Sequence, residues 1–190
     1  MLVPMRAILD ASDKNGYAQG AFNVNAVCQV KAAVDVHQIL RSPAIIQGAD
    51  LANGFMGGRT DFANSTLEDK KAGAKNIGAA VKKYAADSDI PVALHLDHGK
   101  NFDSCIAAIE GGYTSVMIDG SSLPFDENVE LTREVVKYAH ERGVTVEGEL
   151  GVLAGVEDHV FAATSTYTNP LSAIDFFKKT GVDALAISYG

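Results

Sequence analysis

Apolar residues along the chain recur in two alternating patterns. Short apolar runs, typical of buried strands, alternate with longer segments whose apolar positions repeat at helical spacing. Proline or a capping residue opens these helical segments and glycine closes them, as at Pro4 and Gly16. Asn25 is placed to cap the second helix, Thr66 to begin the helix after the glycine-rich loop, and Asn169-Pro170 to open the last helix. The pattern predicts strands at 18–22, 44–47, 91–97, 115–119, 144–150 and 183–188, a glycine-rich loop at 48–58, and helices between the strands.

The alternation of strands and helices predicts a parallel sheet covered by helices. A doubly wound open sheet and a closed (β/α)8 barrel both satisfy it. No G-x-G-x-x-G turn follows a predicted strand, which disfavours dinucleotide binding. A complete TIM barrel has eight units in about 250 residues, whereas these 190 residues contain six predicted strands. As a barrel, the chain would therefore be an incomplete one, with about six of the eight β/α units.

The charge balance narrows the classes of function. There are 16 Lys+Arg against 24 Asp+Glu, so the net charge is −8. Duplex nucleic acid is disfavoured as a partner, because phosphate neutralisation needs clustered basic residues. Surplus carboxylates can instead hold a divalent cation, and the cation can hold an anionic substrate.

The chain has no features of a secreted or membrane protein. Its first residues lack the pattern of a signal peptide, and no apolar stretch is long enough to span a bilayer. The two cysteines, Cys28 and Cys105, fit buried thiols in a reducing compartment better than a disulfide. We therefore expect a cytoplasmic domain without a membrane partner.

Polar side chains gather where the predicted strands end. Three consecutive strands close with His95-Leu96-Asp97-His98, with Asp119, and with Glu147-Gly148-Glu149. Because side chains alternate along a strand, His95 shares a face with Asp97 and Glu147 with Glu149. His98 lies where the strand becomes a loop and can turn inward. Parallel strands bring their carboxyl ends to one rim, where such folds place their chemistry.

Each of these positions also has a purely structural explanation. His95 could bond to a backbone carbonyl in the core, Asp119 could cap the turn after it, and Glu147 and Glu149 could be solvated or paired with lysine. One divalent cation would explain all three strands together, since converging carboxylates without a counter-cation repel one another or become protonated. We therefore favour a metal site. Imidazole with carboxylate suits zinc or a neighbouring first-row ion.

The other histidines are harder to use as ligands. His37 and His140 lie within predicted helices, where we expect solvated or partly packed side chains. His159 lies in the loop after the fifth strand and its role stays open.

Seven short motifs follow one another over nearly the whole chain, at residues 20–25, 95–99, 115–120, 124–129, 147–151, 155–158 and 180–186. Taken together and in this order, they resemble the motifs of the class II ketose-bisphosphate aldolases. It implies a metal-dependent (β/α)8 barrel that reversibly cleaves fructose 1,6-bisphosphate into dihydroxyacetone phosphate and glyceraldehyde 3-phosphate, a reaction of glycolysis and gluconeogenesis. A close branch of the family uses the tagatose epimer, and the sequence leaves that alternative open.

The resemblance also implies a metal-ligand set. His98 is similar to the first catalytic Zn²⁺ ligand of the family. Asp119 and Glu149 are similar to the residues that hold a second or alternate cation position. The expected cofactor is thus Zn²⁺, with a second divalent or monovalent cation as an option.

Catalytic and substrate-binding roles follow from the same resemblance. Asp97 is similar to the acid that protonates, and later deprotonates, the hydroxyl of the aldehyde fragment. Glu157, in the loop after the fifth strand, resembles the glutamate that moves the proton on the dihydroxyacetone carbon. Asn23 is similar to the asparagine that contacts the sugar bisphosphate. At Ala49, relatives have a serine that contacts substrate.

Two hypotheses remain for the whole chain. In the first, residues 1–190 are a single truncated aldolase barrel domain, strands one to six, because two further zinc-binding histidines of the family would follow Gly190. That chain alone would be inactive, and the full-length protein would form a homo-oligomer. In the second, the chain is a complete, non-catalytic half-barrel remnant. A third interpretation, another metal-dependent barrel lyase, requires the motif series to be coincidental.

Overall fold

The computed structural model describes residues 1–153, 155–157 and 160–189, with the side chains of 155–157 and 160–162 outside the description. Its helices are α1 (Met5–Asn15), α2 (Val27–Leu40), α3 (Asp50–Met56), α4 (Leu67–Ala86), α5 (Phe102–Glu110), α6 (Phe125–His140) and α7 (Pro170–Thr180), with a 3-10 turn η1 (Phe62–Asn64). Its strands are β1 (Ala21–Asn23), β2 (Ala44–Ala49), β3 (Val92–Gly99), β4 (Ser115–Ile118), β5 (Thr145–Leu150), β6 (Gly155–Glu157), β7 (Val160–Ala162) and β8 (Ala184–Ile187).

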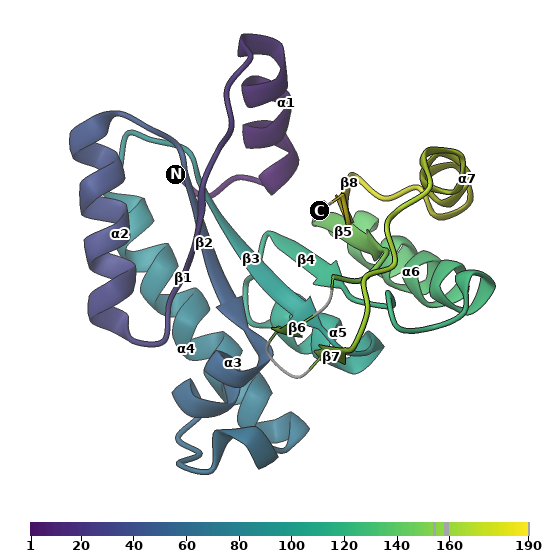
Figure 1. Cartoon of the computed structure of the whole chain (residues 1–190). Helices are drawn as coiled ribbons and strands as arrows, with labels where there is room; N and C mark the ends of the chain where they lie inside the picture. The colour runs from purple at the N-terminus through teal and green to yellow at the C-terminus, as the bar shows by residue number, and fades with distance from the viewer. Residues whose placement is uncertain (154, 158–159, 190) are drawn as a thin grey trace.

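Six of these strands form one parallel sheet in the order β1-β2-β3-β4-β5-β8. The sheet curls, and its helices follow the order of the strands along the outer face, with α2 beside α4, α4 beside α5, α5 beside α6, and α6 beside α7 (Figure 1). A doubly wound sheet would carry helices on both faces. The fold is therefore an incomplete (β/α)8 barrel, which confirms the predicted fold class.

The first residues of β2 and β3 are apolar on both faces because both faces are covered there. Ile46 and Leu94 belong to the large core between the sheet and the outer helices. The neighbouring residues Ile45 and Ala93 point the other way and pack against Met5 and Ile8 of α1. Helix α1 lies where β2 and β3 begin (Figure 1). It thus closes the amino end of the inner face, and the inner face remains open at the carboxyl ends of the strands.

The region after β2 differs from its prediction. Residues 48–58 read as a glycine-rich loop, but α3 occupies Asp50–Met56. Glycine serves here to bring helices together: a Cβ at Gly73 of α4 would lie 1.7 Å from the Asn53 carbonyl oxygen of α3. Short helices with internal Asn and Gly show little local helical propensity, so packing against α4 decides the conformation.

Several predicted helix ends are confirmed and others are wrong. Thr66 forms a capping box with Asp69 at the start of α4, and Asn169 caps α7. Asn25 does not cap α2, whose N-cap is Ala26. The backbone N–H of Asn25 instead donates to the Gln29 side chain. The loop after β5 contains an antiparallel hairpin, β6 and β7, that the pattern did not predict.

The cysteines and outlying histidines are placed as follows. Cys105 is buried, but Cys28 is exposed, so the prediction of two buried thiols is wrong for Cys28. The reason is helical geometry: the buried stripe of α2 runs through Val30, Val34 and His37, and Cys28 lies on another side of that helix. His140 is partly exposed and bonds to Asp183, whereas His159 lies outside the described residues.

Among the helices described here, none is long and apolar enough to cross a membrane.

Candidate metal centre and active-site cavity

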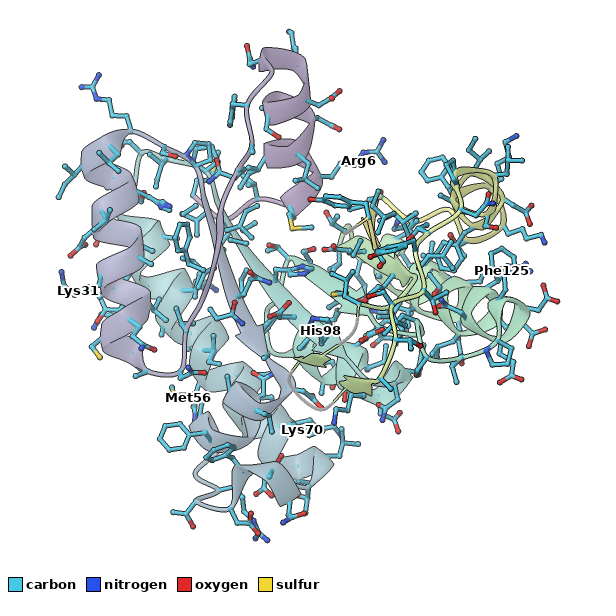
Figure 2. All side chains as sticks on the ribbon, viewed as in Figure 1. Arg6, Lys31, Met56, Lys70, His98 and Phe125 are labelled. Carbon is cyan, nitrogen blue, oxygen red and sulfur yellow. The ribbon has the colours of Figure 1, made fainter. Side chains whose placement is uncertain are left out.

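A cavity of about 520 Å³ opens on the inner side of the sheet. Side chains from β2, β3, β5 and β8 line it, including Gln47, Asp97, His98, Glu147 and Glu149. In Figure 2, His98 lies near the centre of the molecule, whereas Lys31 and Phe125 mark the outer helices. The carboxyl ends of the strands therefore share one cavity, as the alternation pattern predicted.

Three potential metal ligands meet beside this cavity, which two of them, His98 and Glu149, line. His98 Nδ1 lies 3.0 Å from Asp119 Oδ2 and 3.7 Å from Glu149 Oε2. One ligand atom from each of the three residues lies within 4.8 Å of the other two. The side chains of His98 and Glu149 are each 17% exposed and that of Asp119 is 8% exposed. The structure thus brings together the three residues that the sequence predicted as metal ligands.

An irregularity in β3 turns His98 into the cavity. The register of β3 against β4 shifts between Leu96 and Gly99. His98 has a φ of 48°, in the left-handed region that non-glycine residues rarely adopt and that recurs at functional sites. The Asp119 amide donates to the Gly99 carbonyl at 3.0 Å and so restores the pairing just beyond the bulge. Because of this bulge, both Asp97 and His98 line the cavity.

The electrostatics of the cluster are dominated by the pair of His98 and Asp119. The hydrogen bond to Asp119 raises the pKa of His98 to about 9 against the opposing effect of burial, and Asp97 and Glu149 add to the rise. Burial by itself would raise the pKa of Asp119, but hydrogen bonds from His98 and Ser121 outweigh it and the pKa lies below its usual value. The protonated imidazole therefore acts as counter-cation to the converging carboxylates.

The same residues fit a divalent cation. One imidazole nitrogen and two carboxylate oxygens form a donor set that suits zinc and neighbouring first-row ions. Their mutual distances allow a shared ion after small side-chain movements. A cation would replace the His98 proton and neutralise the same carboxylates. Asp119 also accepts hydrogen bonds from the Ser121 backbone N–H and hydroxyl at 3.0 and 2.6 Å. It therefore caps the turn that follows it, as the structural explanation predicted, and it also lies where it could bind a metal ion.

Two further predicted residues touch each other beside the cluster. Asn23, at the end of β1, donates from Nδ2 to Asp97 Oδ2 at 2.7 Å. The strand β2 lies between β1 and β3, so this contact spans two strand spacings at the rim. The candidate acid and the candidate substrate-binding amide are thus neighbours. Glu157 lies in β6, but its side chain falls outside the described residues.

The structure also adds residues that the motifs did not single out. Ser121 follows Asp119 by two positions, a spacing typical of side-chain bonds to a following turn. Gln47 pairs in register with His95 and lines the cavity. His95 itself does not bond to a backbone carbonyl as proposed; its ring meets the Ser115 and Glu147 side chains.

The sequence of this chain was compared with those of known proteins and matches one family. A sequence model described as fructose-bisphosphate aldolase class-II matches residues 3–190. A fructose-bisphosphate aldolase of Treponema pallidum is 48% identical over 193 residues, covering 100% of this chain and 54% of the relative. A fructose-bisphosphate aldolase of Geobacillus stearothermophilus is 40% identical over 191 residues, covering 100% of this chain and 61% of the relative.

Solved structures agree with the sequence relatives. The crystal structure of the YdjI aldolase from Escherichia coli K12 superposes with a TM-score of 0.78 at 30% identity, covering 100% of this chain and 61% of that one. The chain thus spans between 54% and 61% of the length of these relatives. Because the family model extends over almost every residue, the chain belongs to the class II fructose-bisphosphate aldolase family.

Proposed function

We propose that residues 1–190 form a single truncated barrel domain that supplies the first six strands of a zinc-dependent fructose-1,6-bisphosphate aldolase. The observation that supports this most directly is the meeting of His98, Asp119 and Glu149 within 4.8 Å at the rim of the sheet. In the complete polypeptide, the reaction is the reversible cleavage of the sugar bisphosphate to dihydroxyacetone phosphate and glyceraldehyde 3-phosphate in glycolysis. We propose that the complete polypeptide acts in the cytoplasm and forms a homo-oligomer.

The proposed metal ligands in this chain are His98, Asp119 and Glu149. A bound Zn²⁺ would supply Lewis-acid stabilisation of the negative charge that develops on substrate oxygens when the carbon–carbon bond breaks. The chain's own contribution is to present one neutral imidazole and two carboxylates from three adjacent strands. His98 must release its proton to bind the ion, and the cavity gives that proton a route to solvent.

Proton transfer to the aldehyde fragment is assigned to Asp97. Its carboxylate accepts a hydrogen bond from Asn23 Nδ2 at 2.7 Å, which orients one oxygen, and its side chain lines the cavity. A positioned general acid–base of this kind contributes about 10²–10⁴-fold to the rate. Asn23 is proposed to contact the sugar as well, and Glu157 to move the proton on the dihydroxyacetone carbon.

The activity is proposed for a polypeptide of the relatives' length, and the 190 residues alone are expected not to turn over. The sheet ends at β1 and β8, and neither of these strands has a second partner among the described residues. Unpaired parallel edges favour association or aggregation. A chain with two open edges also leaves the cavity unclosed on one side.

Two measurements test the proposal. Zinc stoichiometry on the purified protein should fall from about one per chain to none when His98→Ala or Asp119→Ala is introduced, while His140→Ala, a partly exposed histidine on α6, leaves it unchanged. Cleavage of fructose 1,6-bisphosphate should be absent for the 190-residue chain and present for a polypeptide of the relatives' length. Absence of metal binding in both proteins would support the non-catalytic alternative and refute the proposal.

A further inference from the structure

A second polar group lies beneath the metal-ligand cluster, deeper in the inner face. His95 of β3 is 2% exposed, and its ring meets side chains from the neighbouring strand β4 and from β5, the next strand in the sheet. Nδ1 lies 2.8 Å from Ser115 Oγ of β4, which is itself fully buried. Nε2 lies 3.3 Å from Glu147 Oε2 of β5. We call His95, Ser115 and Glu147 the interior triad.

The hydrogen-bond roles within the interior triad follow from its chemistry. A carboxylate oxygen only accepts, so the proton on the imidazole resides on Nε2 and points to Glu147. Nδ1 then accepts from the Ser115 hydroxyl. The sulfur of Met5 lies 3.8 Å from the same hydroxyl, but a thioether is a weaker acceptor than an imidazole nitrogen. One ring therefore bridges three strands through its two nitrogens.

The three strands that this ring joins are the same three that carry the metal-ligand candidates. His98 follows His95 on β3, Asp119 follows Ser115 just after β4, and Glu149 follows Glu147 on β5. In register, His95 pairs with Ser115, and Met117 of β4 pairs with Glu147. The triad therefore lies upstream of the ligands on every strand, immediately before the bulge at which the pairing of β3 with β4 shifts.

This placement matters because the bulge weakens the backbone connection where the ligands are held. Between Leu96 and Gly99 the regular pairing of β3 with β4 is interrupted. A buried side-chain bridge just below can keep the three strands at a constant spacing and angle. Hydrogen bonds behind a metal site orient its ligands, and their loss costs about 10–100-fold in metal affinity in proteins where it has been measured.

We propose that His95, held by Ser115 and Glu147, is a positioning residue for the His98, Asp119 and Glu149 metal site. The inference rests on the proposed function, since it assigns the triad a role in metal binding. It goes beyond that function by giving a role to three residues outside the proposed ligand set, two of which, His95 and Glu147, line the same cavity.

The test is a Co²⁺ titration of the protein followed by the visible absorption of the bound ion, which reports both affinity and ligand geometry. His95→Phe preserves a buried ring and removes both hydrogen bonds, and should weaken Co²⁺ binding about tenfold and alter the absorption spectrum. The matched control is His37→Phe, which replaces another buried histidine, on α2, and should change neither the affinity nor the spectrum.

A second measurement needs no metal. The Asp119 amide donates to the Gly99 carbonyl across the bulge, so its hydrogen-exchange rate reports the spacing of the ligand ends. It should exchange faster in His95→Phe than in the wild-type protein, whereas amides that join β1 to β2 should not change. Ser115→Ala takes the place of His95→Phe if that variant does not fold.

The outcomes separate the two proposals. If the wild-type protein binds Co²⁺ and His95→Phe binds it equally well with the same spectrum, the positioning role is refuted and the metal site stands. If neither the wild-type 190-residue protein nor a polypeptide of the relatives' length binds Co²⁺, the metal function fails. In that case faster exchange of the Asp119 amide in His95→Phe supports a role of His95 in holding the strand ends that carry His98, Asp119 and Glu149, and an unchanged rate overturns that role too.

Discussion

Metal binding at the His98 cluster should depend steeply on pH, because a proton and a cation compete for the same imidazole. The hydrogen bond to Asp119 raises the pKa of His98 to about 9, above the ordinary histidine value of about 6.5. A metal ligand must be unprotonated. As pH falls below 9, a growing share of the metal-free protein therefore carries His98 in the form that cannot bind the ion.

The size of the effect follows from that pKa. With a pKa of about 9, roughly 1% of His98 is neutral at pH 7, and each unit of pH below 9 lowers the apparent affinity about tenfold. Between pH 8 and pH 6 the loss is therefore about 100-fold, or about 2.7 kcal/mol. A histidine with an ordinary pKa would lose only a few-fold over the same range.

Calorimetric titration with Zn²⁺ at pH 6, 7 and 8 in buffers of different ionisation enthalpy measures both the affinity and the protons released. We expect about one proton released per ion bound at pH 7. NMR titration of the His98 ring in the metal-free protein gives the pKa directly. A ring that titrates near 6.5, or an affinity that is flat between pH 6 and 8, would refute the reasoning.

Three other substitutions test separate parts of the structure. In a polypeptide of the relatives' length, Asp97→Asn should lower the rate of aldol cleavage about 10²–10⁴-fold and leave the zinc stoichiometry unchanged. A small effect in steady-state assays would show that Asp97 is not the proton-transfer residue. Gly73→Ala should lower the free energy of unfolding in urea by about 1–3 kcal/mol, because the new Cβ would lie 1.7 Å from the Asn53 carbonyl oxygen. An unchanged urea midpoint would argue against close packing of α3 on α4. Thr66→Ala should lower the free energy of unfolding by about 1 kcal/mol in the same assay, because the capping box is lost. Thr66→Ser should retain most of that stability, because serine keeps the hydroxyl.

The alternation of strands and helices was predictable because it depends on local signals. Apolar periodicity and end signals such as Thr66 and Asn169 act within a few residues of chain. At α2 such a signal fails: the N-cap is Ala26, which makes no side-chain capping bond, and the backbone N–H of Asn25 donates to the Gln29 side chain. Helix α3 was missed for a different reason: its conformation depends on contact with α4, some twenty residues away.

The chain by itself determined the fold class, the rim at which polar residues gather, and the candidates His98, Asp119, Glu149 and Asp97, because parallel strands must bring their carboxyl ends together. Only the tertiary structure decided how these side chains meet. The bulge that turns His98 inward depends on the pairing of β3 with β4. Three other features likewise depend on distances between segments far apart in sequence. They are the raised pKa of His98, the contact of Asn23 with Asp97, and the contacts of His95 with side chains of β4 and β5. Periodicity shows which way a residue faces, and only the packed strands determine what it touches.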